Sequence, residues 1–101
     1  MPRRAHAPVH PGEVLDREFL GPYALTPSRV ARDLGVPSRH VREIVRRAKP
    51  ISANLALRLA RYFGTSEEFW MNLQMHYDLA VARGQLGKRL AKEVAVLPRV
   101  S

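Results

Sequence analysis

The chain has 101 residues, enough for one small domain, and its 46% apolar and 26% charged residues are typical of a globular protein. It contains no cysteine, which excludes disulfides, thiolate metal sites and thiol nucleophiles, and no apolar run is long enough to cross a membrane or to form a secretory signal. Because 17 Lys and Arg outnumber 9 Asp and Glu, the formal net charge is +8, and we expect a cytoplasmic protein whose charge attracts a polyanion or merely keeps it soluble.

The first expected element is a helix over residues 12–20. Before it, residues 1–9 are rich in proline and poor in apolar side chains, which predicts a flexible N-terminal arm. Apolar side chains then recur at helical spacing until Gly21 and Pro22, a pair that ends helices.

Two short helices are predicted next, between Thr26 and Arg46. Thr26 is a favourable N-cap, Pro27 suits the first helical position, and Gly35 ends the helix by accepting a positive φ. The second helix is expected to begin near Ser38 and to run to about Arg46, because its apolar residues lie three and four positions apart.

Two longer helices follow. Ser52 caps the first of them, which Gly64 ends. Ser66 caps the second, which is expected to run to about Arg83 and to stop before Gly84.

The C-terminal extension, residues 84–101, is ambiguous. Its apolar residues are close to helical spacing, but residues 94–97 could equally form a strand. Since no segment indicates a strand in the core, the sequence predicts an all-α fold.

The two short helices have the pattern of a DNA-binding helix-turn-helix. A small residue, Ala31, lets the second helix cross close to the first, and Gly35 permits the sharp turn between them. Val41 and Ile44 then fill the angle between the helices.

The charge distribution supports this interpretation. Residues 26–50 carry a net charge of +5 and residues 84–101 carry +3, whereas the charges of the other segments cancel. An arginine on an exposed helix face can donate to both acceptors of a guanine in the major groove. The residues expected to read base edges are Ser38, Arg39, His40, Arg42, Glu43 and Arg46, and those expected to contact phosphates are Ser28, Arg47 and Lys49. The alternative is a helical hairpin with a solvated arginine face.

Glu43 has two possible roles on that face. It either accepts from a cytosine amino group or pairs with Arg39 or Arg46 along the helix, and we favour the pairing.

The last long helix carries two apolar arcs where one would suffice for the domain's own core. The first arc consists of Phe69, Trp70, Leu73, Tyr77, Ala80 and Val81. The second arc consists of Met71, Met75, Leu79 and Ala82. On one side of the helix, Gln74 and Asp78 separate the two arcs. We expect a surface for a second subunit or another partner, formed by Met71, Met75, Leu79, Leu86 and Leu90. The alternative is that the C-terminal extension folds back over this arc.

Enzymatic and metal-binding functions are not expected. The four histidines lack the spacing of a metal site, and no carboxylate cluster accompanies them. Successive residues such as His76, Tyr77 and Asp78 point in different directions on a helix and cannot converge on one substrate. RNA binding is a weaker alternative, because the aromatic residues lie outside the basic segment.

Several motifs in the same order also resemble those of a known family. His10-Pro11-Gly12-Glu13, the helix-turn-helix, the segment from Ala56 to Ser66 and the motifs Phe69-Trp70, Asn72-Leu73-Gln74 and Tyr77-Asp78-Leu79 are similar to HigA/VapI-type antitoxins, within the XRE (lambda-repressor-like) superfamily. One departure is that this chain lacks the glycine usual after the recognition helix, so the helix is expected to extend toward Pro50.

The resemblance implies a five-helix domain over residues 10–83, with a flexible arm before it and the extension after it. It also implies a homodimer on a palindromic operator, repression of its own promoter, no cofactor, and neutralisation of a HigB/RelE-type ribonuclease toxin. A stand-alone repressor without a toxin and a protein-binding inhibitor with incidental DNA affinity are the alternatives.

Overall fold

The computed structural model describes residues 7–99, which contain helices and no strand, so the prediction of an all-α fold is confirmed. Most of the expected N-terminal arm, residues 1–6, lies outside the described residues, and residues 7–9 are exposed and non-helical. The elements are α1 (Pro11–Val14), the π-helical segment η1 (Leu15–Leu20), α2 (Pro27–Leu34), α3 (Ser38–Val45), α4 (Ala53–Phe63), α5 (Glu67–Leu86) and α6 (Arg89–Glu93).

The first predicted helix is present but changes its geometry halfway. It starts at Pro11 as an α-helix and continues as a π-helix, in which Gly21 N–H donates to the carbonyl of Asp16 over 2.9 Å, five residues back. A turn of this width places residues five apart on one face. Both Leu15 and Leu20 are therefore buried in the core.

The predicted caps of α2 are confirmed. Oγ1 of Thr26 accepts from the N–H of Arg29 over 3.1 Å, and Pro27 occupies the first turn. Gly35 has a φ of 77°, a conformation in which a residue with a side chain would be strained. This glycine turns the chain into α3.

Helix α3 ends close to Arg46, as its apolar spacing predicted, and the further extension toward Pro50 that the missing glycine suggested is wrong. The helix ends at Val45, and Arg47 takes the left-handed conformation itself, with a φ of 65°. The N–H of Ala48 donates to the carbonyl of Glu43 over 2.7 Å, which is the hydrogen bond of a Schellman turn. The turn keeps the geometry that glycine usually supplies, although this chain has arginine there.

The C-terminal boundary of α5 also differs from the prediction. Ser52 and Ser66 cap α4 and α5, and Gly64 ends α4 as expected. However, α5 continues through Gly84 to Leu86 and ends at Gly87, which has a φ of 51°. One glycine inside a helix costs only about 1 kcal/mol, too little to interrupt twenty residues of helix.

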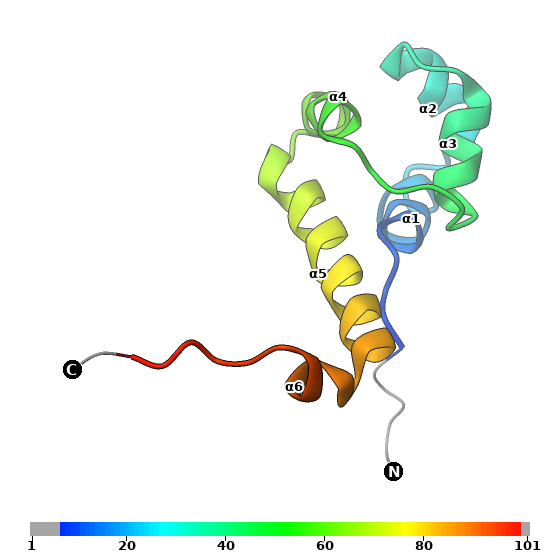
Figure 1. Cartoon of the computed structure of the whole chain (residues 1–101). Helices are drawn as coiled ribbons and strands as arrows, with labels where there is room; N and C mark the ends of the chain where they lie inside the picture. The colour runs from blue at the N-terminus through cyan, green and yellow to red at the C-terminus, as the bar shows by residue number, and fades with distance from the viewer. Residues whose placement is uncertain (1–6, 100–101) are drawn as a thin grey trace.

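The C-terminal extension is part helix and part extended chain. Residues 89–93 form α6. Residues 94–99 form no helix and no strand, although the sequence had left both alternatives open for residues 94–97. Figure 1 shows this segment leaving the domain beyond the end of α5. It therefore does not fold back over the domain, and α6 has no buried residue.

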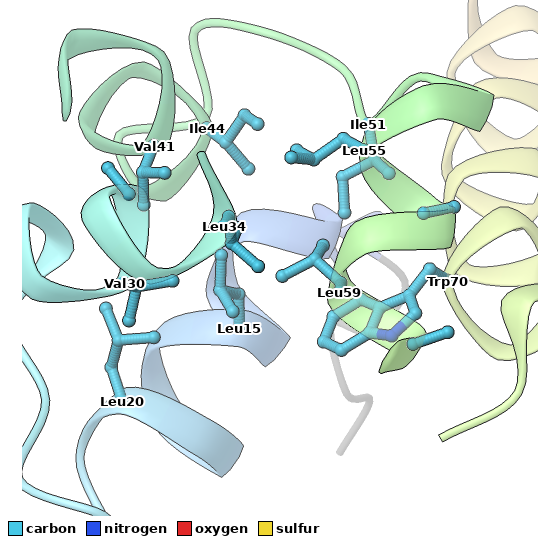
Figure 2. Close-up of a cluster of buried hydrophobic side chains, with 13 residues drawn as sticks. Leu15, Leu20, Val30, Leu34, Val41, Ile44, Ile51, Leu55, Leu59 and Trp70 are labelled. Carbon is cyan, nitrogen blue, oxygen red and sulfur yellow. The ribbon is translucent and has the colours of Figure 1, made fainter. Parts of the chain in front are cut away.

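The core lies where the helices converge (Figure 2). Its side chains come from η1, α2, α3, α4 and α5 and from Ile51 in the segment before α4, with Leu15, Ile44, Leu59 and Trp70 fully buried. The indole N–H of Trp70 donates to Oγ1 of Thr65 over 2.7 Å, so its polar atom is satisfied. Among residues 7–99, no helix is long and apolar enough to cross a membrane.

Candidate nucleic-acid interface

Helix α3 presents the predicted reader residues on the face opposite the core. Its inner residues Val41 and Ile44 are buried, whereas Arg39, Arg42 and Arg46 are exposed. The three other candidate readers on the helix, Ser38, His40 and Glu43, are half-buried. Ser38 and His40 lie in the first turn of α3 and Arg46 at its C-cap, and the exposed arginines make this surface cationic.

Glu43 pairs with two cations on this surface. Its Oε2 accepts from Nε of Arg39 over 3.2 Å, and its Oε1 lies 3.3 Å from Nζ of Lys49. The hydrogen bond from Arg39, followed by that from Lys49, holds the pKa of Glu43 below its ordinary value, although partial desolvation opposes the shift. The expected pairing with Arg39 is present, but the second partner is Lys49 rather than Arg46.

The other two arginines of the surface differ in how they are held. Nη1 of Arg42 donates to Oγ of Ser38 over 3.0 Å, one helical turn back. For Arg46, no side-chain hydrogen bond or ion pair is present within residues 7–99. Arg46 is thus the arginine most free to reorient.

The residues predicted to contact phosphates are all exposed. Ser28 is exposed in the first turn of α2. Nη2 of Arg47 lies 3.2 Å from Oε1 of Glu13, whose other oxygen pairs with Arg17. Lys49 pairs with Glu43, so both cations after α3 are held by carboxylates of the chain itself.

The role of His10, which caps α1 and packs it against α5, was not predicted. His10 is buried, its Nδ1 accepts from the N–H of Gly12 over 2.9 Å, and its ring packs edge-on against Tyr77 of α5. Burial, followed by the charge of Arg47, lowers the pKa of His10, and Asp78 opposes the shift. The signals in the sequence were the family motif that begins at His10 and the place of this polar side chain directly before Pro11, which is the position of an N-cap.

Gln74 also has a role that the helical pattern did not indicate. It was placed on a polar boundary between two apolar arcs, yet it is buried. Its Oε1 accepts from the N–H of Ile51 over 2.7 Å, and its Nε2 donates to Asp78 over 2.9 Å. Gln74 therefore ties the segment after α3 to helix α5.

The predicted partner surface on α5 and α6 is uncovered. Met71, Met75, Leu79 and Leu90 are 37%, 45%, 44% and 49% exposed, and Leu86 is half-buried. Of the first apolar arc, only Trp70 is fully buried, and Leu73 packs against the core.

No metal-binding cluster was expected from the sequence. Between residues 7 and 99, no group of three or more His, Asp or Glu side chains could hold a metal ion. Tyr77 contacts the ring of His10 and lines one pocket with His10 and Asp78, a pocket that His76 does not line.

Comparisons with known proteins agree with the geometry. No family model matches the chain. It is 45% identical to virulence-associated protein I of Dichelobacter nodosus over 74 residues, 73% of this chain and 68% of that protein. It is 34% identical to antitoxin HigA-1 of Vibrio cholerae over 79 residues, 78% of this chain and 74% of that protein.

A solved structure matches over almost the whole length. The Pseudomonas aeruginosa antitoxin HigA, solved with the higBA promoter, superposes with a TM-score of 0.88 at 47% identity, over 91% of this chain and all of that chain. The proteins similar to this chain are antitoxins and helix-turn-helix regulators rather than enzymes. This chain belongs to the HigA/VapI family of helix-turn-helix antitoxins.

Proposed function

We propose that this protein is the DNA-binding antitoxin of a type II toxin–antitoxin module. In this proposal it binds a palindromic operator as a dimer, represses its own promoter and neutralises a HigB/RelE-type ribonuclease toxin. The observation that supports it best is the outer surface of α3, where three exposed arginines lie opposite a buried apolar face. A helix that enters the major groove needs this arrangement.

The roles of the side chains follow from their positions. The readers of base edges are Ser38, Arg39, His40, Arg42, Glu43 and Arg46. In this proposal the exposed residues Ser28, Arg47 and Lys49 contact phosphates, which fix the position of the protein without reading sequence. Because an operator is part of the bacterial chromosome or a plasmid, this function places the protein in the cytoplasm.

The dimer uses the uncovered apolar residues of α5 and α6. Two-fold readers place two recognition helices about one turn of DNA apart, which requires two subunits. The side chains of Met71, Met75, Leu79, Leu86 and Leu90 provide an apolar surface that residues 7–99 of one copy do not bury completely.

Neutralisation of a toxin is supported by the family. A matched relative is named antitoxin HigA-1, and the solved relative is an antitoxin with a promoter. This part of the proposal is independent of the arginine surface, so it needs its own experiment.

The experiment has two arms. In the first, the tagged chain is isolated from its native cells, and the DNA bound to it is sequenced. Recovery of its own promoter supports autorepression, and recovery of random DNA contradicts it. In the second, the chain is co-expressed with the protein encoded beside it. Rescue of growth from that protein supports the antitoxin function, whereas promoter binding without rescue supports a stand-alone repressor.

Substitutions separate readers from phosphate contacts. Arg39→Ala or Arg42→Ala is expected to cost about 1–3 kcal/mol at the operator and to relax discrimination. Arg47→Ala or Lys49→Ala is expected to weaken binding to all duplexes and to reduce the salt dependence. Equal effects of all four on operator and random DNA would contradict the assignment of readers.

A further inference from the structure

The carboxylate of Glu43 lies between two cations on the surface proposed to face DNA. It accepts from Nε of Arg39 over 3.2 Å and lies 3.3 Å from Nζ of Lys49. The side chain of Arg39 is 79% exposed, whereas that of Glu43 is only 24% exposed. An ion pair this exposed contributes little to the stability of the fold. A contribution to folding therefore does not explain why Glu43 pairs with Arg39.

The contact between Glu43 and Arg39 determines which nitrogens of the arginine remain free. Glu43 engages Nε, and neither terminal nitrogen of Arg39 has a hydrogen-bond partner within residues 7–99. Those two nitrogens can donate together to O6 and N7 of one guanine. An arginine already held at Nε also loses fewer rotamers on binding than an unrestrained one.

The turn after α3 engages the other oxygen of Glu43. Arg47 is left-handed, and Ala48 N–H donates to the carbonyl of Glu43, so the chain doubles back over the last turn of the helix. This brings Lys49 beside the carboxylate. With a cation at each oxygen, the carboxylate is poorly placed to accept from a cytosine amino group.

We propose that Glu43 is a positioning residue that orients Arg39 for recognition of one guanine through its two terminal nitrogens, and that Glu43 does not itself read a base. The inference rests on the proposed function, since it takes binding of DNA by α3 as its starting point. It refines the role of Glu43 from reader to support of a reader.

The test measures base preference rather than affinity alone. The wild-type chain first selects duplexes from a random pool, and the selected site is then varied one base pair at a time. Arg39→Ala is expected to remove the preference for one guanine. The wild-type chain should lose the same preference when that guanine is replaced by 7-deazaguanine, because the N7 acceptor is then missing. Glu43→Gln is expected to weaken the same preference by about tenfold, and Glu43→Ala more strongly, because glutamine still offers a neutral acceptor.

Two further variants separate positioning from other effects. In the Arg39→Ala background, Glu43→Gln is expected to change no base preference, since its effect passes through Arg39. Glu93→Gln is a matched control, because Arg89 Nε donates to Glu93 on α6 in the same i,i+4 geometry over 3.0 Å. It is expected to leave every base preference unchanged. Glu43→Gln should also shift the thermal midpoint by no more than about 4 °C.

Each result decides the question. If the wild-type chain selects no sequence, the proposed function itself fails. If it selects one and Glu43→Gln keeps the guanine preference, or weakens selected and random duplexes equally, only the positioning role is overturned. Loss of preference at a base pair that Arg39→Ala leaves intact would show that Glu43 reads that base directly.

Discussion

The backbone of Gly12 lies directly against the carbonyl group of Ile44. A Cβ on Gly12 would stand 1.8 Å from that carbonyl oxygen, far inside contact distance. Gly12 is in the first turn of α1, and Ile44 is in the last turn of α3. The position of the recognition helix therefore depends on a close approach that only glycine allows.

Gly12→Ala is expected to destabilise the protein by about 3 kcal/mol or more, because the obstacle is backbone rather than a movable side chain. Gly84→Ala is the control, since a Cβ at Gly84 in α5 meets nothing within 4 Å. That variant should gain about 1 kcal/mol from helix propensity. Urea unfolding measures both, and similar effects of the two substitutions would contradict the close contact.

The buried imidazole of His10 predicts a loss of stability in acid. Its Nδ1 accepts from Gly12 N–H, and burial, followed by the charge of Arg47, lowers its pKa below the ordinary 6.5. As the pH falls through about 6.5, the unfolded chain takes up the proton before the folded one. The stability is therefore fully present above that pH and declines as the pH falls toward the pKa of the folded state.

The measurement is the free energy of unfolding in urea from about pH 7.5 to about pH 5. In His10→Asn, the asparagine oxygen can still cap α1 but does not titrate. The decline of stability with falling pH should be shallower in this variant. Parallel curves would show that His10 is not the group responsible.

The left-handed backbone of Arg47 costs stability that glycine would restore. Its φ of 65° is disfavoured by a Cβ by about 1–2 kcal/mol. Arg47→Gly and Arg47→Ala both remove the ion pair with Glu13, so their difference isolates the backbone. We expect the glycine variant to be the more stable of the two by about 1 kcal/mol.

The same two variants test the role of the guanidinium. If Arg47 contacts a phosphate, both should reduce the slope of log affinity against log salt by about 1. Two results would contradict this account: equal stability of the variants, and an unchanged salt slope in both.

Gln74 is expected to be needed for the fold, although it lies on a polar boundary of the helical pattern. Gln74→Leu leaves the N–H of Ile51 without its acceptor in a buried setting, at a cost of about 1–3 kcal/mol. Gln85→Leu makes the same change at an exposed site on α5 and should alter stability by less than about 0.5 kcal/mol. Equal destabilisation by the two changes, measured by thermal unfolding, would contradict the role of this hydrogen bond.

The apolar surface of α5 is expected to hold the proposed dimer together. Met75→Lys places a charge in that interface and should give monomers at micromolar concentration by sedimentation. Leu57→Lys is the control, because Leu57 is similarly exposed on α4, outside the proposed surface. A truncated chain that ends at Gly87 lacks Leu90, and its dimer should dissociate more readily. If this truncated chain forms an unchanged dimer, the C-terminal extension is not needed for dimerisation.

The sequence by itself determined where helices α2 to α5 begin, the N-caps of α2, α4 and α5, and the face of α3 that carries the arginines. These features depend on contacts three to five residues apart, such as Thr26 Oγ1 with Arg29 N–H or Ser66 Oγ with Phe69 N–H. Such contacts form within one turn, so local residue types are enough to predict them. The glycines at positions 35 and 64 were predictable for the same reason.

Only the tertiary structure decided how these pieces are joined. The burial of His10 against Tyr77 and the hydrogen bond from Ile51 to Gln74 join residues distant in sequence. The ion pair between Arg47, in the turn after α3, and Glu13 of α1 is a third contact of this kind. No local pattern encodes which distant backbone or carboxylate will lie nearby, since that follows from the packing of the whole core.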